Sequence, residues 1–182
     1  LVGSEGTLAF STKIELKLAP LLGRRGVGAC HFGSFAKAMD AAQHIVKLGP
    51  IAVELVDRTM LGLARDIAMF KPTIDAVVRG NPAAILFVEF AEEDQYENLR
   101  HLIRLKELMG ELGLGWDKTG AAWGGVVDVF DARLQAAITD MRTAGLNIMM
   151  SMKEEGKPIS FVEDCAVPLE HLADYTSRLT YI

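Results

Sequence analysis

An ordered alternation of strand-like and helix-like segments between residues 26 and 118 limits this chain to few folds. Residues 83–90 (AAILFVEF) give the clearest predicted strand, because a short apolar run with branched and aromatic side chains is typical of a buried strand. Residues 26–32 and 51–56 predict two further strands, and a fourth is expected within residues 114–118. The chain therefore has enough strands for one small sheet.

Helix-forming segments follow these strands, and their ends are recognisable. Ser34 is a predicted N-cap for a helix that Gly49 and Pro50 end, since proline cannot continue the helix and glycine accepts the left-handed exit. Asp57 caps a second helical segment, and Pro72 opens a short third one. The second and third strands are therefore separated by a helical insert.

A long amphipathic helix follows the third strand. Asp94 and Glu97 have capping-box spacing at its start, and Gly113 marks its end. Without the insert, the order of elements is βαββαβ, the pattern of a ferredoxin-like fold. We therefore predict an α+β domain whose antiparallel, ferredoxin-like sheet carries helices on one face, plus the helical insert.

Residues after Gly120 predict a partial second α/β unit. A helix is expected from Asp131 onward, followed by an apolar segment at residues 146–152 that contains three methionines. Such flexible, polarisable side chains suit an adaptable core or an interface with another domain. A strand at residues 159–167 and a helix opened by Pro168 complete this unit.

Composition excludes several classes of function. The net charge is −5 and the pI is about 5.4, so we expect no nucleic-acid partner. No apolar run reaches the ~18 residues that a membrane-spanning helix needs.

Cys30 and Cys165 are far apart and belong to no CxxC pair, which argues against a disulfide framework or a zinc site. We interpret both as buried, reduced thiols of a cytoplasmic protein.

The histidines show no metal-ligand spacing. We expect all four to be structural or surface residues: His31, His44, His101 and His171. We therefore predict no metal site in the chain.

The first 20 residues differ from the rest. Gly3 and Gly6 allow positive φ and close backbone approach, and residues 7–18 alternate well enough to form a strand or a hairpin arm. The chain begins with Leu1 inside an apolar run, as a piece of a longer protein would.

Four sequence patches carry a family resemblance. Residues 3–8 (GSEGTL) and residues 51–57 (IAVELVD) resemble two segments of FAD-linked oxidases of the vanillyl-alcohol-oxidase type. The first is similar to the closing motif of their flavin-binding domain, and the second to the E-L-(M/V)-D strand of their C-terminal domain. Met141-Arg142 is similar to the end of a helix that bears a substrate-binding arginine. Residues 161–168 (FVEDCAVP) resemble the E-D-x-x-V-P segment of D-lactate, glycolate and D-2-hydroxyglutarate dehydrogenases.

The resemblance implies a division of the chain and a reaction for its parent. Residues 1–20 would end the FAD-binding domain, and residues 21–182 would form the substrate (cap) domain, truncated at its C-terminus. The parent would oxidise a D-2-hydroxy acid to the 2-oxo acid, with FAD as hydride acceptor. The sequence between the patches is similar to that of long family members fused to an iron–sulfur domain. This similarity implies a 4Fe–4S centre in the parent. The electron acceptor stays open, as does a peripheral membrane contact of the parent.

Site residues follow from the same resemblance. The cofactor-binding residues would be Gly3, Ser4, Glu5, Gly6, Thr7 and Leu8. Arg142 would bind the substrate carboxylate, because its planar fork can contact two oxygens; the alternative is an arginine that satisfies helix carbonyls. Glu163 and Asp164 are weaker candidates, since neighbouring residues of a strand point to opposite faces.

Catalytic and metal-binding residues are expected outside this chain. We therefore expect the piece by itself neither to hold FAD tightly nor to turn over. Two other classes remain open. One is a ferredoxin-like regulatory module that binds a small molecule. The other is an interaction module that uses Met149, Met150 and Met152 as its contact surface.

Overall fold

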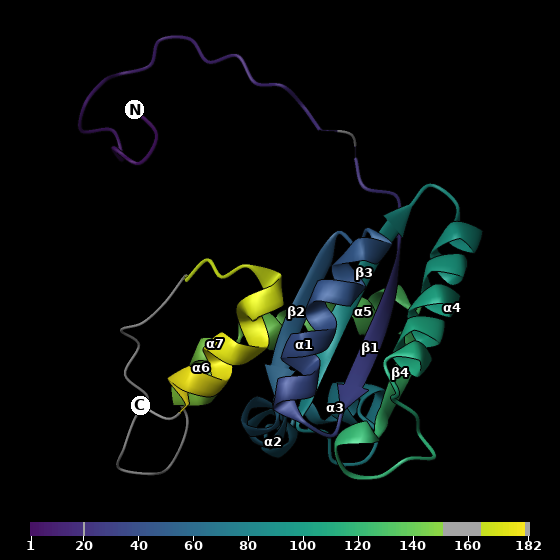
Figure 1. The fold of residues 1–182 in the computed structure, drawn as a ribbon. Helices are drawn as coiled ribbons and strands as arrows, with labels where there is room; N and C mark the ends of the chain where they lie inside the picture. Colours follow the sequence, from purple (N-terminus) through teal and green to yellow (C-terminus); the bar gives the residue numbers. More distant parts are fainter. Residues whose placement is uncertain (20, 151–164, 181–182) are drawn as a thin grey trace.

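The computed structural model describes residues 1–19, 21–150 and 165–180. At its centre lies an antiparallel sheet of four strands in the order β2-β3-β1-β4 (Figure 1). The strands are β1 (Arg24–Phe32), β2 (Ala52–Asp57), β3 (Ala84–Glu92) and β4 (Gly124–Val129). This is the strand order of a ferredoxin-like sheet, so the predicted α+β class is confirmed.

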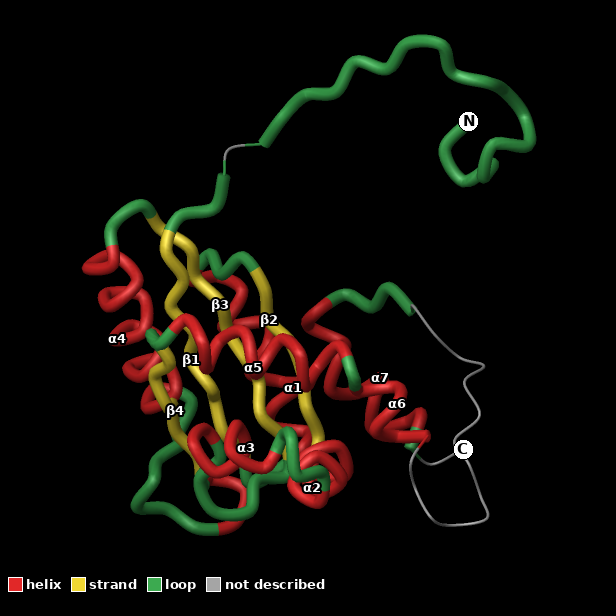
Figure 2. Tube along the Cα trace, turned by 180° about the vertical axis from the view of Figure 1, so that it is seen from behind, coloured by secondary structure: helices red, strands yellow, loops and turns green. Residues whose placement is uncertain are grey.

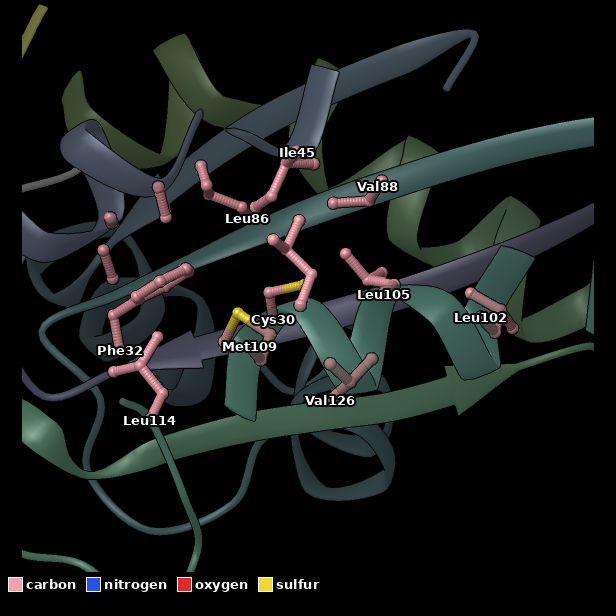
Figure 3. Packing of buried hydrophobic residues seen from close by; sticks show 14 of the residues in the cluster. Cys30, Phe32, Ile45, Leu86, Val88, Leu102, Leu105, Met109, Leu114 and Val126 are labelled. Carbon is pink, nitrogen blue, oxygen red and sulfur yellow. The ribbon is translucent and has the colours of Figure 1, made fainter. Parts of the chain in front are cut away.

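The two crossover helices, α1 (Phe35–Ile45) and α4 (Gln95–Glu111), cover one face of the sheet. Figure 3 shows their shared core, in which Cys30 of β1 lies between Leu86 of β3 and Val126 of β4. Leu105 and Met109 of α4 pack against these strand residues in the same buried cluster. These side chains are almost fully buried, so removing their apolar surface from water stabilises this half of the domain.

The opposite face is covered as well (Figure 2). The predicted insert forms α2 (Arg58–Asp66) and α3 (Lys71–Val77), and α5 (Ala132–Thr143) and α6 (Gly145–Met150) lie beside them. Phe87 of β3 packs here with Ile74 and Met141. The expectation of helices on one face therefore holds for the crossover pair, and the structure adds a second helical layer. Because β3 is buried on both faces, its sequence reads as a continuous apolar run.

Most predicted helix ends are confirmed. The carboxylate of Asp57 accepts a hydrogen bond from the Met60 N–H, and Asp94 accepts one from Tyr96. Gly49 has φ of 74° after the short 3₁₀ turn Val46–Leu48 that extends α1. Ser34 begins α1 in an extended conformation, with no hydrogen bond from its side chain to the helix.

The fourth strand was predicted in the wrong place. Residues 114–118 form a turn in which only Gly115 makes an isolated bridge, to Trp123, and the strand is β4. Gly124 and Gly125 begin β4, at two positions that have no room for a side chain. A Cβ on Gly125 would overlap the Trp116 indole, and one on Gly124 would overlap a β1 carbonyl.

The N-terminal segment is not the predicted strand. Residues 1–19 carry no strand and extend away from the body of the domain (Figure 1). An extended segment needs a neighbour to pair its backbone groups. Among the described residues none pairs with it, and its alternate apolar side chains are largely exposed: Leu8, Phe10, Ile14, Leu16 and Leu18.

The C-terminal part matches the prediction only for its helix. Pro168 precedes a 3₁₀ turn (Leu169–His171) and α7 (Leu172–Leu179), which packs against α1. Most of the strand expected at residues 159–167 lies outside the described residues, and residues 165–167 have no regular structure. In the described parts of the chain, no helix combines the length and the apolar character that crossing a membrane requires.

Candidate functional site

Arg142 lies in the last turn of α5, and the sequence fixes that helix on the sheet. Asp131 caps its start by accepting a hydrogen bond from the Leu134 N–H over 2.8 Å. The Gln135 amide donates to the carbonyl oxygens of Arg25 (3.1 Å) and Val129 (2.9 Å), which ties α5 to β1 and β4. Because Met141 is buried on the sheet, the neighbouring Arg142 is held at the edge of this contact.

The Arg142 guanidinium lies between carboxylates from two strands. Its Nη2 forms an ion pair with Oε1 of Glu54 on β2, and its Nη1 lies 3.5 Å from Oε1 of Glu89 on β3. The register pairs Ala52 with Glu89, so the two glutamates project from the same face of the sheet as diagonal neighbours. Arg25 of β1 adds a second cation, 3.8 Å from Oε2 of Glu89.

We call Arg25, Glu54, Glu89 and Arg142 the carboxylate–arginine cluster. It lies where the apolar face formed by Ile85 and Phe87 ends. Its two positive and two negative charges balance. The side chain of Glu89 is only 11% exposed, and burial of an ionised carboxylate needs such cationic partners.

A pocket of about 370 Å³ opens beside Arg142. Its walls come from β2, α2, the end of α5 and α6: Glu54, Leu55, Val56, Met60, Arg142, Thr143, Gly145 and Met149. The arginine supplies a bidentate donor for a carboxylate, and the methionines supply an adaptable apolar wall. The arrangement suits a small organic acid.

The candidate cofactor residues at the N-terminus form a compact double turn. Gly3 and Gly6 have φ of 84° and 79°, and Glu5 between them has φ of 48°. The Thr7 hydroxyl donates to the Ser4 carbonyl over 2.7 Å, which closes the turn. A Cβ built on either glycine would meet no atom within 4 Å, so the backbone here is open to close approach by a ligand. Leu8 follows with its side chain exposed.

The structure does not bring all candidate residues together. The turn at residues 3–8 lies in the N-terminal segment, whereas Arg142 lies on α5. The weaker candidates Glu163 and Asp164 lie outside the described residues.

His31 is structural, as predicted. It is fully buried in β1, and its Nε2 accepts a hydrogen bond from the Arg79 backbone N–H over 3.1 Å. The ring proton is therefore on Nδ1, which donates to the Ala29 carbonyl over 2.8 Å. Trp116 and Trp123 meet the ring edge-on. Burial, with a smaller contribution from the Arg79 charge, lowers the pKa of His31 to about 4.

The cysteines differ from each other. Cys30 is buried as expected, and this burial raises the pKa of its thiol above the ordinary range. Cys165 is exposed, so the prediction that both thiols are buried is wrong for this one. It lies in a stretch without regular structure, and its side chain hydrogen-bonds Tyr175 and raises the pKa of that phenol. Within the described ranges, no group of three or more histidine, cysteine or acidic side chains is arranged to hold a metal ion.

Comparison with known proteins decides the family. Residues 23–181 match the family model described as FAD linked oxidases, C-terminal domain. The chain belongs to this family. This FAD-linked oxidase C-terminal domain is 33% identical to a D-2-hydroxyglutarate dehydrogenase of Pantoea ananatis, over 96% of its own length. Relatives with the same name in Escherichia coli and Haemophilus influenzae are 32% and 31% identical, each over 98% of the chain. The chain spans only 17% or 18% of the length of these relatives.

Sequence reasoning about this FAD-linked oxidase domain missed three residues of the carboxylate–arginine cluster. Glu54 lies inside the quoted E-L-V-D patch, but its partner could not be named from sequence. Glu89 is the single charged residue within the apolar run 83–90, and a lone carboxylate in a buried strand signals a paired charge. Arg25 had no such signal, because it lies at the outer end of a strand that begins earlier than predicted.

Proposed function

We propose that this chain is the substrate-binding part of an FAD-dependent D-2-hydroxy-acid dehydrogenase, which oxidises D-2-hydroxyglutarate or a similar acid to the 2-oxo acid. The observation that carries the proposal is the position of Arg142: a guanidinium fixed at the wall of a pocket, in a domain of the FAD-linked oxidase family. The names of the relatives support the choice of substrate class.

Arg142 would bind the substrate carboxylate next to the carbon that is oxidised. Two parallel hydrogen bonds from one guanidinium fix both the position and the plane of a carboxylate, which orients the carbon–hydrogen bond to be broken. FAD supplies the acceptor for the hydride when it is bound. The pocket walls from α2 and α6 would exclude water from this carboxylate and strengthen its contact with Arg142.

The N-terminal turn would contribute to FAD binding. Gly3, Ser4, Glu5, Gly6, Thr7 and Leu8 form the candidate contact, and the open backbone at both glycines supports it. We assign residues 1–20 to the end of the FAD-binding domain and residues 21–182 to the substrate domain. The start of the family match at residue 23 supports this boundary. The alternating apolar side chains of residues 8–18 would then be covered by that other domain.

Further properties of the parent are part of the proposal. They are a 4Fe–4S centre, which the resemblance to long family members implies, a cytoplasmic location, which reduced thiols favour, and a peripheral membrane contact of the parent. Iron and acid-labile sulfide analysis of the purified parent tests the first, and cell fractionation tests the other two. The electron acceptor is left open.

The test of the function is Arg142→Ala in the full-length parent. We expect kcat/KM for the hydroxy acid to fall on the order of 10²-fold or more, since a charged, bidentate contact made in the transition state is lost. Arg133→Ala is the matched control, because Arg133 is an exposed residue of the same helix. Unchanged turnover in Arg142→Ala would instead favour a regulatory or interaction module with a ferredoxin-like fold.

A further inference from the structure

We infer that Glu54 and Glu89 are positioning residues, which hold the Arg142 guanidinium from two neighbouring strands and orient it toward the pocket. The inference rests on the proposed role of Arg142 in substrate binding. It adds two carboxylates that would act on the substrate through the arginine and not by touching it.

The two contacts fix the plane of the guanidinium. They reach different terminal nitrogens, Nη2 for Glu54 and Nη1 for Glu89. One contact would leave the group free to rotate about it, whereas two contacts at separate atoms do not. An arginine has five N–H donors, and these two contacts use two of them, so the fork retains donors for a further carboxylate. Both glutamates are on paired strands, which are more precise supports than loops.

Glu89 is the deeper support. It lies on the central strand β3, its side chain is 11% exposed, and Arg25 approaches it from the other neighbouring strand. Arg25 and Arg142 are the two cationic neighbours that compensate the cost of burying this carboxylate. Removing its charge therefore loosens Arg142 and leaves Arg25 with its carboxylate partner neutralised.

Glu54 is the outer support. Its side chain is 45% exposed and lines the pocket together with Arg142. It therefore orients the edge of the guanidinium that faces an entering acid. Because it is half-exposed, its replacement carries little risk for folding.

The first experiment measures KM and kcat of the full-length parent carrying Glu54→Gln or Glu89→Gln. Gln keeps the side-chain length and one acceptor oxygen but removes the charge. We expect KM for the hydroxy acid to rise about tenfold in each variant while kcat changes less. An Arg142 side chain that is no longer held in place must be ordered when the substrate binds, and this cost weakens substrate binding. Glu93→Gln, an exposed residue just beyond β3, is the control. Unchanged KM in both variants would overturn the inference, and so would a fall in KM, which would show that Glu54 competes with the substrate.

The second experiment is chemical rescue with guanidinium ion at non-denaturing concentrations. We expect guanidinium to restore several-fold activity to Arg142→Ala, because Glu54 and Glu89 would hold the free ion in place of the side chain. The double variant Arg142→Ala/Glu89→Gln should lose that rescue. If guanidinium restores activity to the single and the double variant equally, Glu89 does not have the proposed role. If it restores activity to neither variant, the KM values of the first experiment decide. Full activity of Arg142→Ala without guanidinium would instead refute the proposed function itself.

Discussion

The backbone N–H of Arg79 donates a hydrogen bond to Nε2 of the buried His31 over 3.1 Å. This contact joins the end of the helical insert to the central strand β1. It also requires the neutral imidazole, since a protonated ring would have no lone pair on Nε2 to accept the bond. The fold therefore depends on the protonation state of one histidine.

Stability should fall as the solution is acidified. The pKa of His31 is about 4 in the folded chain against an ordinary value of 6.5, so between these values the unfolded chain binds a proton that the folded chain does not. The full stabilisation is present above pH 6.5 and is lost as pH falls toward 4, by at most about 3 kcal/mol. Denaturant unfolding at several pH values, followed by the fluorescence of Trp116 and Trp123, measures this. A His31→Gln variant with an equally steep pH dependence would show that other groups cause it.

Gly125→Ala should destabilise the domain strongly. The added methyl group would overlap the Trp116 indole, and overpacking of this kind costs about 1–3 kcal/mol. Gly62→Ala is the matched control: Gly62 is an exposed residue of α2 with no atom within 4 Å of the new Cβ, so the change should be neutral or stabilising by up to about 1 kcal/mol. Thermal unfolding of both variants checks the difference, and equal melting temperatures would count against the close packing of β4.

The two thiols should react at very different rates. Cys165 is exposed, whereas Cys30 lies in the core with a raised pKa and so has almost no thiolate at neutral pH. We expect an alkylating reagent to modify Cys165 in the native protein and Cys30 only after denaturation. Peptide mass spectrometry after timed alkylation distinguishes the sites. Rapid native labelling of Cys30 would mean that the layer under α1 and α4 opens readily.

Asp131→Ala should weaken α5, the helix that carries Arg142. The change removes the acceptor for the Leu134 N–H and is expected to cost about 1 kcal/mol of unfolding free energy. Asp131→Asn keeps an acceptor oxygen and should retain most of the stability. Chemical denaturation of the two variants makes the comparison. Equal losses in both would assign the effect to charge near the helix end and not to the cap.

Local sequence signals predicted most of the fold because they act within a few residues. The caps at Asp57 and Asp94 and the stop at Gly49 depend only on nearby backbone groups. The long apolar run of β3 is typical of a strand that is buried on both faces of a sheet. The position of β4 could not be found this way, because Gly124 is required by the His31 carbonyl and Gly125 by the Trp116 indole. Only the folded chain reveals these contacts.

The candidate site was predictable for Arg142 and not for its surroundings. A family resemblance singled out the arginine, whereas its partners Glu54 and Glu89 are brought to it by the pairing of β2 with β3, which a single sequence does not specify. The substrate-binding role of Arg142, the cofactor role of residues 3–8 and the roles of Glu163 and Asp164 all stay predictions.

Among residues 1–19, 21–150 and 165–180, the two helical layers cover both faces of the sheet and no strand pairs with the outer edge of β2 or of β4. A further strand, from elsewhere in the protein or from another chain, can join it only beside β2 or β4. Such a strand would bind main-chain groups in the plane of the sheet, while Glu54 and Glu89 project out of that plane. The domain can therefore be widened laterally without disturbing the groups that hold Arg142.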